Sequence, residues 1–401
     1  MGPTQFQKQC MVLVFRLCGR IHTGAVVFVL PDGKTASFGR DKREPIPRVE
    51  ILAYRFFARV VTGGDIGLGE AYMDGDWRCN DLPGFIRLLI TNREVFSDGN
   101  PFSALAARIL NQARHLLNRN SIPGSRKNMR RHYDLSNRFF ELFLDDSMTY
   151  SCGLYDKPGA SLDQAQRNKL QTILTKAAVE PGDHLLEIGC GWGGFAIEAV
   201  QETGCRVTGI TVSQQQYEYA RRRVAACDLE DRIDIQFCDY RHVKGPFDRI
   251  VSIEMLEAVG HRYLGVFFNI CDRLLKPGGK VVIQTITIPD QHYARYRREA
   301  DWIQKYIFPG ACIPSLTTMC QAMTAHSGLV VENIESIGRH YVKTLQAWRR
   351  RFRQNREQVT ALGFDRAFRR KWNYYLALCE AGFAEKALGD LQMILTRPAR
   401  P

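Results

Sequence analysis

The sequence contains no apolar run long enough to cross a membrane as a helix. Its most apolar stretches, Met11–Phe15 and Gly24–Leu30, are far shorter than the roughly 20 residues that a spanning helix needs. Arg16 ends the first stretch and no small-residue cleavage site follows it, so the sequence also predicts no secretory signal. We therefore expect a protein that stays in the cytoplasm.

Paired cysteines are also missing. The 12 cysteines are scattered and form no CxxC pair, which argues against a disulfide framework and against a zinc site. We expect most of them to be reduced and buried as small apolar side chains, and we predict no metal site.

Acidic residues are fewer than basic ones. The chain has 42 Asp and Glu against 55 Lys and Arg, which gives a formal net charge of +13. This balance favours anionic partners, either nucleic acid or an anionic membrane surface, and composition alone does not choose between them. With 45% hydrophobic and 24% charged residues, the composition is otherwise that of a globular protein.

The amino-terminal part is predicted to form a mixed α/β module. The β-rich run Gly24–Leu30 is followed by a turn at Pro31–Gly33, and Thr35–Phe38 can return as the second strand of a hairpin. Residues 63–69 are dense in glycine, and a loop is predicted over Glu70–Trp77. Apolar residues at helical spacing predict an amphipathic helix over Phe102–Leu117.

The best linker candidate is the polar segment 118–128, which contains Pro123 and Gly124. A length of 401 residues favours two or three domains, or one large fold with an appendage. We therefore predict a smaller amino-terminal α/β domain over residues 1–120 and a larger domain over residues 121–401.

The larger domain alternates short apolar runs with helical segments. This alternation predicts a parallel sheet covered by helices on both faces, because strands buried on two sides are apolar almost throughout. The predicted strands are His184–Ile188, Arg206–Val212, Ile233–Phe237, Phe247–Ile253 and Lys280–Ile286.

A glycine-rich turn over residues 186–194 is the strongest local signal. Gly189, Gly191 and Gly193 follow a predicted strand and precede a predicted helix, which is the context that a G-x-G-x-x-G cofactor turn requires. Glycine permits a tight turn and a close approach of a ligand to the backbone. Alone, the motif serves nicotinamide, flavin and S-adenosylmethionine (SAM) alike.

Three further features choose among these cofactors. The second strand ends at Val207–Ser213 without the acid that a nicotinamide site usually carries there. An acid, Glu187, precedes the glycines instead, although it could also be the ion-pair partner of a nearby basic residue. Asp239 and Tyr240 end the third strand and suit an adenine amino group and ring. The sequence therefore resembles a class I SAM-dependent methyltransferase, which implies a doubly wound, mostly parallel seven-stranded sheet.

Flanking motifs resemble the cyclopropane-fatty-acyl-phospholipid synthase family over nearly the whole chain and in order. These motifs are Gly67–Trp77, His132–Asp134 with Asn137, Tyr150–Gly153, Gly189–Gly194, Glu254–Gly260, Tyr306–Gly310, Gly338–Tyr341 and Asn373–Leu376.

The resemblance implies a reaction. Members of the family transfer the SAM methyl carbon to a cis double bond in a phospholipid acyl chain, and the resulting carbocation loses a proton from the new methyl group and closes a cyclopropane ring. A bound bicarbonate serves as the base. A carbocation needs a dry, aromatic-rich pocket, because water would capture it.

The resemblance also assigns site residues. The bicarbonate site falls on Cys152, Glu257, the Ile286 backbone and Tyr341. Gln284 stands where many members have His, and its amide can donate a hydrogen bond but cannot titrate. This departure leaves open a methylated or methylene-bearing product. The implied SAM contacts are Tyr150, Ser151, Glu187, Gly189, Gly191, Gly193, Thr211, Gln216, Asp239 and Tyr240.

Several of these residues have simpler interpretations. Cys152 could be a small buried apolar residue and Tyr341 part of the core. Glu257 could cap a helix or form a salt bridge. Thr211 and Gln216 could form a strand end and a solvated helix turn.

Basic residues cluster near the carboxyl end, where aromatic residues interleave with them. The clusters span residues 349–356 and 366–371. We interpret them as helical surfaces that lie on anionic headgroups, with a solvated face over core aromatics as the alternative. Nucleic acid is not expected, because no nucleic-acid-binding signature accompanies the arginines.

The sequence thus predicts a peripheral membrane enzyme that acts on unsaturated phospholipids at the inner face of the membrane. Its amino-terminal domain is predicted to interact with lipid. A homodimer is left open. The alternatives are a fatty-acyl methyltransferase that closes no ring, a small-molecule N-methyltransferase, and a non-enzymatic binding protein with a relict SAM fold.

Overall fold

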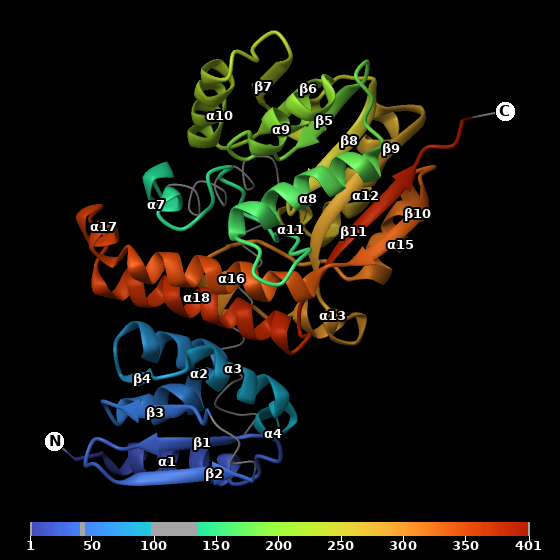
Figure 1. Cartoon of the computed structure of the whole chain (residues 1–401). Coiled ribbons are helices and arrows are strands. Elements are labelled where there is room, and N and C mark those ends of the chain that lie inside the picture. Colours follow the sequence, from blue (N-terminus) through green and yellow to red (C-terminus); the bar gives the residue numbers. More distant parts are fainter. Residues whose placement is uncertain (1, 41–44, 98–134, 400–401) are drawn as a thin grey trace. The chain divides into compact units, whose positions relative to one another are not determined.

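The computed structural model describes residues 2–40, 45–97 and 135–399 (Figure 1). It divides into two compact units. The first unit comprises Met1–Leu117, Arg298–Ile307 and Phe352–Ala387, and the second comprises Asn118–Arg297, Phe308–Arg351 and Leu388–Pro401. The predicted boundary at residue 120, the predicted linker and the predicted helix Phe102–Leu117 all lie outside the described residues.

The second unit is built on a seven-stranded sheet of order β10-β11-β9-β8-β5-β6-β7. Neighbours β9, β8, β5, β6 and β7 pair in parallel, whereas β11 is antiparallel to both β9 and β10. The strands run from green (β5) to red (β11) in Figure 1. This mostly parallel sheet confirms the predicted fold class. The strands are β5 (His184–Ile188), β6 (Arg206–Thr211), β7 (Ile233–Phe237), β8 (Phe247–Ile253), β9 (Leu275–Thr287), β10 (Val330–Ser336) and β11 (Gly389–Thr396).

Both faces of this sheet are buried, in two separate hydrophobic clusters. Leu185 belongs to one cluster and the next residue, Leu186, to the other; Val281 and Val282 divide in the same way. Alternation of side chains along each strand therefore fills two cores, which is why these strands are apolar almost throughout. The helices of the unit are α7 (Asn137–Glu141), α8 (Leu162–Ala177), α9 (Gly194–Thr203), α10 (Gln214–Ala226), α11 (Leu256–Val259), α12 (Leu264–Leu274), α13 (Asp290–Tyr296) and α15 (Leu316–His326).

Local sequence fixes the ends of the helices that surround the site. Ser161 begins α8 with a capping box: its hydroxyl accepts from the Gln164 backbone and the Gln164 side chain accepts from the Ser161 backbone. Ser213 caps α10 by accepting from the Gln216 backbone. Helix α16 (Gly338–Gln354) begins in the second unit and ends in the first.

The first unit contains a four-stranded sheet of order β2-β1-β3-β4. The predicted hairpin is confirmed, because β1 and β2 pair in antiparallel fashion. The predicted loop over Glu70–Trp77 is wrong in its first part: the helix α2 continues to Met73 and is kinked at Gly64 (φ 57°). The elements of the unit are α1 (Gln5–Cys18), β1 (Ala25–Val29), β2 (Thr35–Gly39), β3 (Arg48–Ile51), α2 (Arg55–Met73), β4 (Trp77–Cys79), α3 (Leu82–Thr91), α4 (Arg93–Ser97), α14 (Trp302–Tyr306), α17 (Arg356–Ala361) and α18 (Arg366–Ala384).

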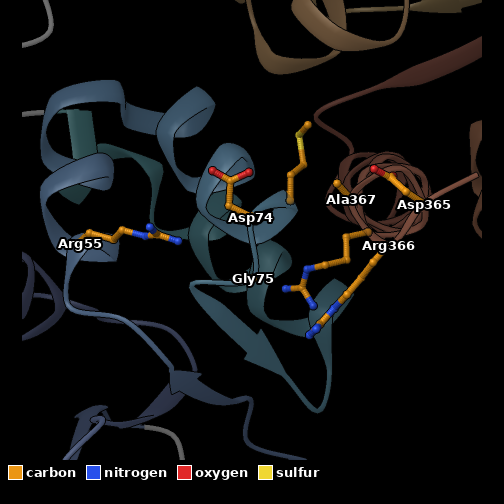
Figure 2. Close-up of a pocket in the computed structure, with 8 residues that line it drawn as sticks. Arg55, Asp74, Gly75, Asp365, Arg366 and Ala367 are labelled. Carbon is orange, nitrogen blue, oxygen red and sulfur yellow. The ribbon is translucent and has the colours of Figure 1, made fainter. Parts of the chain in front are cut away.

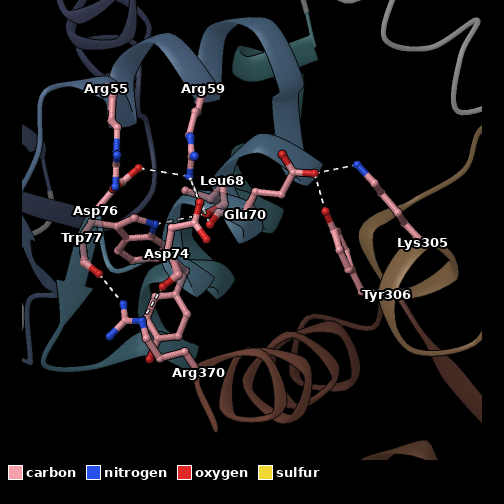
Figure 3. A network of polar contacts seen from close by, with 11 residues as sticks. Arg55, Arg59, Leu68, Glu70, Asp74, Asp76, Trp77, Lys305, Tyr306 and Arg370 are labelled. Atoms are coloured by element: carbon pink, nitrogen blue, oxygen red, sulfur yellow. Dashed lines mark hydrogen bonds and ion pairs between the residues drawn. The ribbon is translucent and has the colours of Figure 1, made fainter. Parts of the chain in front are cut away.

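Polar contacts hold later segments of the chain against α2 (Figure 3). The carboxylate of Glu70 accepts hydrogen bonds from Lys305 Nζ and Tyr306 Oη, both at 2.6 Å. Arg370 of α18 donates to the backbone carbonyls of Tyr72 and Trp77. Segments 298–307 and 352–387 therefore belong to the first unit although they lie far along the chain, so the compact units do not follow a contiguous division.

Close backbone packing reinforces this arrangement. A Cβ on Gly69 would lie 2.4 Å from Trp302 Nε1, so only glycine lets α2 approach α14 this closely. Within residues 2–40, 45–97 and 135–399, no helix has the length and apolarity needed to span a bilayer.

Candidate active site

The glycine turn connects β5 to α9 and contains three glycines with left-handed backbone conformations. Gly189, Gly191 and Gly193 have φ values of 87°, 52° and 81°, a region that other residues rarely adopt. A Cβ added to Gly191 would meet no heavy atom within 4 Å, so the backbone there faces open space. A ligand can therefore approach the main chain at Gly191.

Glu187 lies on β5 beside this turn and is fully buried. Its Oε2 has no hydrogen-bond partner among the described residues. Burial raises the pKa of Glu187 to about 8, and the charge of Lys169 partly opposes that rise. Lys169 itself donates to Ser151 Oγ at 2.8 Å. A buried carboxyl oxygen without a partner is a natural contact for a polar ligand group.

Thr211 and Gln216 form one buried unit at the end of β6. Thr211 Oγ1 donates to Gln216 Oε1 at 2.9 Å and accepts from the Ser213 backbone at 3.1 Å. The alternative interpretation of Gln216 as part of a solvated helix turn is wrong, since only 4% of this residue is exposed.

Asp239 and Tyr240 follow β7, as predicted, but Asp239 already has a partner. Its two carboxylate oxygens accept from Arg241 Nε and Nη2 at 2.8 and 2.7 Å. Burial alone would raise the pKa of Asp239, but the hydrogen bonds and charge of Arg241 lower it. The Tyr240 ring packs against Phe267 with centroids 5.7 Å apart. A role for this pair toward adenine stays a prediction.

A second group of polar side chains gathers around Glu254, a residue that the sequence analysis did not single out. Glu254 Oε1 accepts from the Cys152 backbone N–H at 2.8 Å and from Gln284 Nε2 at 2.9 Å. Glu254 Oε2 accepts from Tyr341 Oη at 2.6 Å. Three segments far apart in sequence thus converge on one carboxylate. Glu254 follows β8 and has a φ of 48°, in the left-handed region.

Glu257 lies next to this group at the start of α11. Its Oε1 accepts from the Ile286 backbone N–H and from Thr285 Oγ1, the latter at 3.0 Å. Within the described part of the chain, its Oε2 has no hydrogen-bond partner. Burial, together with the charge of Glu254, raises the pKa of Glu257 to about 8, so its carboxyl group is protonated at neutral pH.

Two further buried groups complete the cluster, and the sequence analysis missed both. Asp390 pairs with Ile286 across β11 and β9. Burial and the charges of Glu254 and Glu257 raise the pKa of Asp390 far above its usual range. Burial lowers the pKa of Lys169 to about 8, against the opposing attraction of Glu254 and Asp145. No local motif marks either residue.

The structure brings the predicted catalytic residues together, and carboxylates of the chain accept hydrogen bonds from several of them. The Cys152 N–H, the Tyr341 hydroxyl and the Gln284 amide are engaged by Glu254, and the Ile286 N–H is engaged by Glu257. These donors hold carboxylates of the chain itself, and a role for the predicted ligand set toward bicarbonate stays a prediction. The Cys152 thiol instead faces the carbonyl oxygens of Gly153 and Ile337, at 3.5 and 3.9 Å.

Aromatic rings link this cluster to the glycine turn. Tyr150 packs against Trp348 and Phe140, with centroids 5.1 and 5.5 Å apart. Phe140 also packs against Trp192 of the glycine turn at 4.9 Å, and Trp192 Nε1 donates to Asn137 Oδ1 at 2.8 Å. The surroundings are apolar and aromatic, as cation chemistry requires.

The aromatic residues that interleave with the basic clusters near the carboxyl end are less exposed than expected. Trp348, Phe352 and Trp372 are buried, so these aromatics belong to the core. Arg351 donates to the Leu144 carbonyl at 2.7 Å and to Asp163 at 2.9 Å. The aromatic half of the predicted membrane-facing surface is therefore wrong for these residues.

A polar pocket of about 550 Å³ lies in the first unit (Figure 2). Arg366 extends from α18 toward the turn at Gly75. The lining of the pocket includes three arginines and two aspartates: Arg55, Arg366, Arg370, Asp74 and Asp365.

The sheet order, the glycine turn and the buried acid beside it together define a class I SAM-dependent methyltransferase. Comparison with known proteins gives the family: the model of the mycolic acid cyclopropane synthetase family matches residues 121–393, and the chain belongs to this family.

Named relatives extend over most of the chain. The tuberculostearic acid methyltransferase UfaA1 of Mycobacterium tuberculosis is 39% identical over 390 residues, which cover 93% of this chain and 88% of the relative. The cyclopropane-fatty-acyl-phospholipid synthase of Escherichia coli strain K12 is 35% identical and covers 85% of this chain and 86% of its own.

Solved structures agree with this assignment. The mycolic acid cyclopropane synthase CmaA1, complexed with SAH and CTAB, has a TM-score of 0.63 and 32% identity and covers 67% of this chain and 97% of its own. Coclaurine N-methyltransferase has a TM-score of 0.62 at 18% identity, over 84% of this chain and 100% of its own, and that likeness shows the fold alone.

Proposed function

We propose that this protein transfers the methyl carbon of SAM to a cis double bond in the acyl chain of an unsaturated phospholipid and then removes a proton from the transferred carbon. The observation that carries the proposal is the carboxylate cluster of the half-buried Glu254 and Glu257 with the buried Asp390, within an aromatic-rich region. A relative named as a cyclopropane-fatty-acyl-phospholipid synthase, aligned over 85% of the chain, supports the substrate class.

The residues at the glycine turn fit SAM. The open backbone at Gly191 and the unpartnered Oε2 of Glu187 supply close approach and an acceptor for an amino group. When bound, SAM supplies an electrophilic methyl group on a sulfonium. We propose that the contacts come from Tyr150, Ser151, Glu187, Gly189, Gly191, Gly193, Thr211, Gln216, Asp239 and Tyr240.

The chain's own residues supply what an alkene needs in order to react. An alkene is a weak nucleophile, so alignment of the acyl chain must provide much of the rate. Carbon–carbon bond formation leaves a positive charge on the acyl chain, which the rings of Tyr150, Phe140 and Trp348 can stabilise through their faces while they exclude water.

Proton loss from the new methyl carbon can end in two ways. The electron pair of the broken C–H bond closes a cyclopropane ring, or, after a hydride moves from the methylated carbon to the neighbouring cationic carbon, it forms a methylene double bond. We propose the ring as the product. The second candidate is the branched chain: Gln284 departs from the common His, and the Mycobacterium tuberculosis relative is named as a tuberculostearic acid methyltransferase, not as a cyclopropane synthase.

We propose further that the protein associates peripherally with the anionic inner face of the membrane. The net charge of +13 favours such a surface, and Arg366 in this pocket offers donors for a phosphate group, whereas Arg55 already pairs with Asp76 and Arg370 donates to backbone carbonyls. The two aspartates in the pocket are already engaged: Asp74 pairs with Arg59, and Asp365 caps α18.

The test uses the full chain, SAM with an isotopically labelled methyl carbon, and vesicles of a phospholipid with one cis double bond per acyl chain. We expect the label to enter the acyl chain, and NMR of the extracted lipid distinguishes a ring methylene from an exocyclic one. Mass alone does not, because both products add one CH₂. Vesicles of a saturated phospholipid are the control, and label in neither lipid would contradict the proposal.

A further inference from the structure

We propose that Glu254 is the base that takes the proton from the transferred methyl carbon, so that this enzyme carries its anion on its own chain and does not use bicarbonate. The inference rests on the proposed function, since that reaction supplies the acidic carbon. Glu254 would act through its carboxylate oxygens, which lie among the donors that resemblance assigns to a bound bicarbonate.

The donor set around Glu254 carries the argument. A carboxylate and a bicarbonate ion share a planar O–C–O group that accepts hydrogen bonds at two oxygens. Here Oε1 receives the Cys152 N–H and the Gln284 amide, and Oε2 receives the Tyr341 hydroxyl. The Asp390 side chain also hydrogen-bonds with Glu254, so four groups engage the roughly four acceptor positions of the carboxylate, and the Asp390 contact must break when Glu254 takes the proton. The side chain thus takes the contacts that a bound anion would have.

The backbone at Glu254 supports a dedicated role. Its φ of 48° is a left-handed conformation that is unfavourable for a residue other than glycine. The next residue, Met255, lies directly behind the cofactor turn, where its Cγ would be 2.9 Å from a Cβ on Gly189. Glu254, the strained residue, and the glycine turn therefore both lie at the carboxyl ends of neighbouring parallel strands. Such strain persists where a side chain is required in one place.

The charge of the neighbouring groups decides which carboxyl group is ionised. Burial raises the pKa of Glu254, but the hydrogen bonds from Tyr341, Cys152 and Gln284 and the charge of Lys169 oppose the rise. The pKa values of Glu257 and Asp390 are raised as well, but Glu254 accepts hydrogen bonds from three N–H and O–H donors, which favour its ionised form. The arrangement avoids adjacent bare charges and leaves Glu254 as the acceptor.

The proton balance is then complete. The methyl C–H bond breaks, its electron pair forms the new carbon–carbon bond of the product, and the proton goes to the Glu254 carboxylate. Asp390 hydrogen-bonds with Glu254 inside the cluster. Glu254 returns the proton to solvent after the product leaves, so no other co-reactant is needed.

The test removes the Glu254 side chain by substitution with glycine. Glu254→Gly keeps a residue that adopts φ 48° readily, so the variant should fold, while the three donors lose their carboxylate. In buffer depleted of carbon dioxide, the wild-type rate of label transfer should not change on addition of bicarbonate. The variant should lose about 10²–10⁴-fold in rate, the range typical of a lost general base, and should recover part of it with bicarbonate or formate.

A second measurement does not depend on activity. Bicarbonate binding, followed by calorimetry with S-adenosylhomocysteine present, should be detectable for Glu254→Gly and absent for the wild type. Asp228→Gly is the matched control, because Asp228 is also a left-handed residue, at φ 55°, but is exposed at the end of α10. That variant should behave as the wild type does in both measurements.

Two results would overturn the inference: a wild-type rate that rises with bicarbonate, or a Glu254→Gly rate equal to that of the wild type without it. If the wild type transfers no label at all, the proposed function fails instead, and the binding comparison still decides whether Glu254 occupies the anion position. Glu254→Gln separates shape from charge, since its amide keeps the size of the side chain but takes up no proton; it should be as slow as the glycine variant and should not respond to bicarbonate.

Discussion

The Tyr341 hydroxyl donates a hydrogen bond of 2.6 Å to Oε2 of Glu254, and this contact joins α16 to the end of β8. Tyr341 is buried, so the contact forms away from water and favours the ionised carboxylate. The residue is therefore a positioning residue for the proposed base rather than a ligand of a separate anion.

Tyr341→Phe should slow the reaction and shift its pH profile. A hydrogen bond to a charged group contributes about 1.5–3 kcal/mol, so we expect a loss of roughly 10-fold to 100-fold in kcat. Loss of the donor raises the pKa of Glu254, which moves the acid limb of the kcat profile to higher pH. The position of this limb also depends on the other titratable groups that face Glu254, which are Lys169 from α8, Asp390 from β11 and Glu257 from α11. An unmoved acid limb would count against this role.

Gly191→Val should abolish binding of S-adenosylhomocysteine in calorimetry while the fold survives. The added side chain meets no protein atom at its Cβ, so it projects into the space that a ligand needs, although φ 52° strains a β-branched residue. Gly182→Val is the control, because Gly182 is also open at Cβ but lies away from the turn and has no left-handed φ. Unchanged affinity in Gly191→Val would refute the assignment of this turn.

The fold could be predicted because its information is local. Each predicted strand of the second unit is a short apolar run, and the run Lys280–Ile286 lies within the longer β9. The second half of the α2 helix was missed because dense glycine is usually a sign of a loop. Here Gly69 serves close packing against Trp302, which only the three-dimensional structure reveals.

The site could likewise be predicted from the sequence only in part. The glycine turn is contiguous in sequence, so it could be found there. Glu254 could not be distinguished from Glu257 within one short motif, because its role depends on donors from residues 152, 284 and 341. Buried Asp390 and Lys169 likewise carry no local signature, and their altered pKa values come from burial and mutual charge.

Glu187 should make the folded protein less stable as pH rises. Its pKa is about 8 in the folded state against an ordinary value of 4.5, so between these values the folded protein binds the proton that the unfolded chain has released. The free energy of unfolding therefore falls with rising pH in this window. Glu187→Gln removes the effect. Between pH 6 and pH 8, the free energy of unfolding measured in urea should fall by up to about 3 kcal/mol more in the wild type than in this variant. Equal slopes for both proteins would contradict this.

The arginine pocket of the first unit should contribute to membrane binding. Each basic residue near an anionic surface adds about 1 kcal/mol, so the charge reversal Arg366→Glu should weaken binding to phosphatidylglycerol vesicles roughly tenfold or more in cosedimentation. Added salt should weaken wild-type binding, because it shortens the Debye length. Arg262→Glu is the control: Arg262 is an exposed arginine that does not line the pocket, and it should lose less. If both reversals weaken binding equally, net charge rather than the pocket accounts for the attraction. If neither does, the charge of this surface has no part in membrane association.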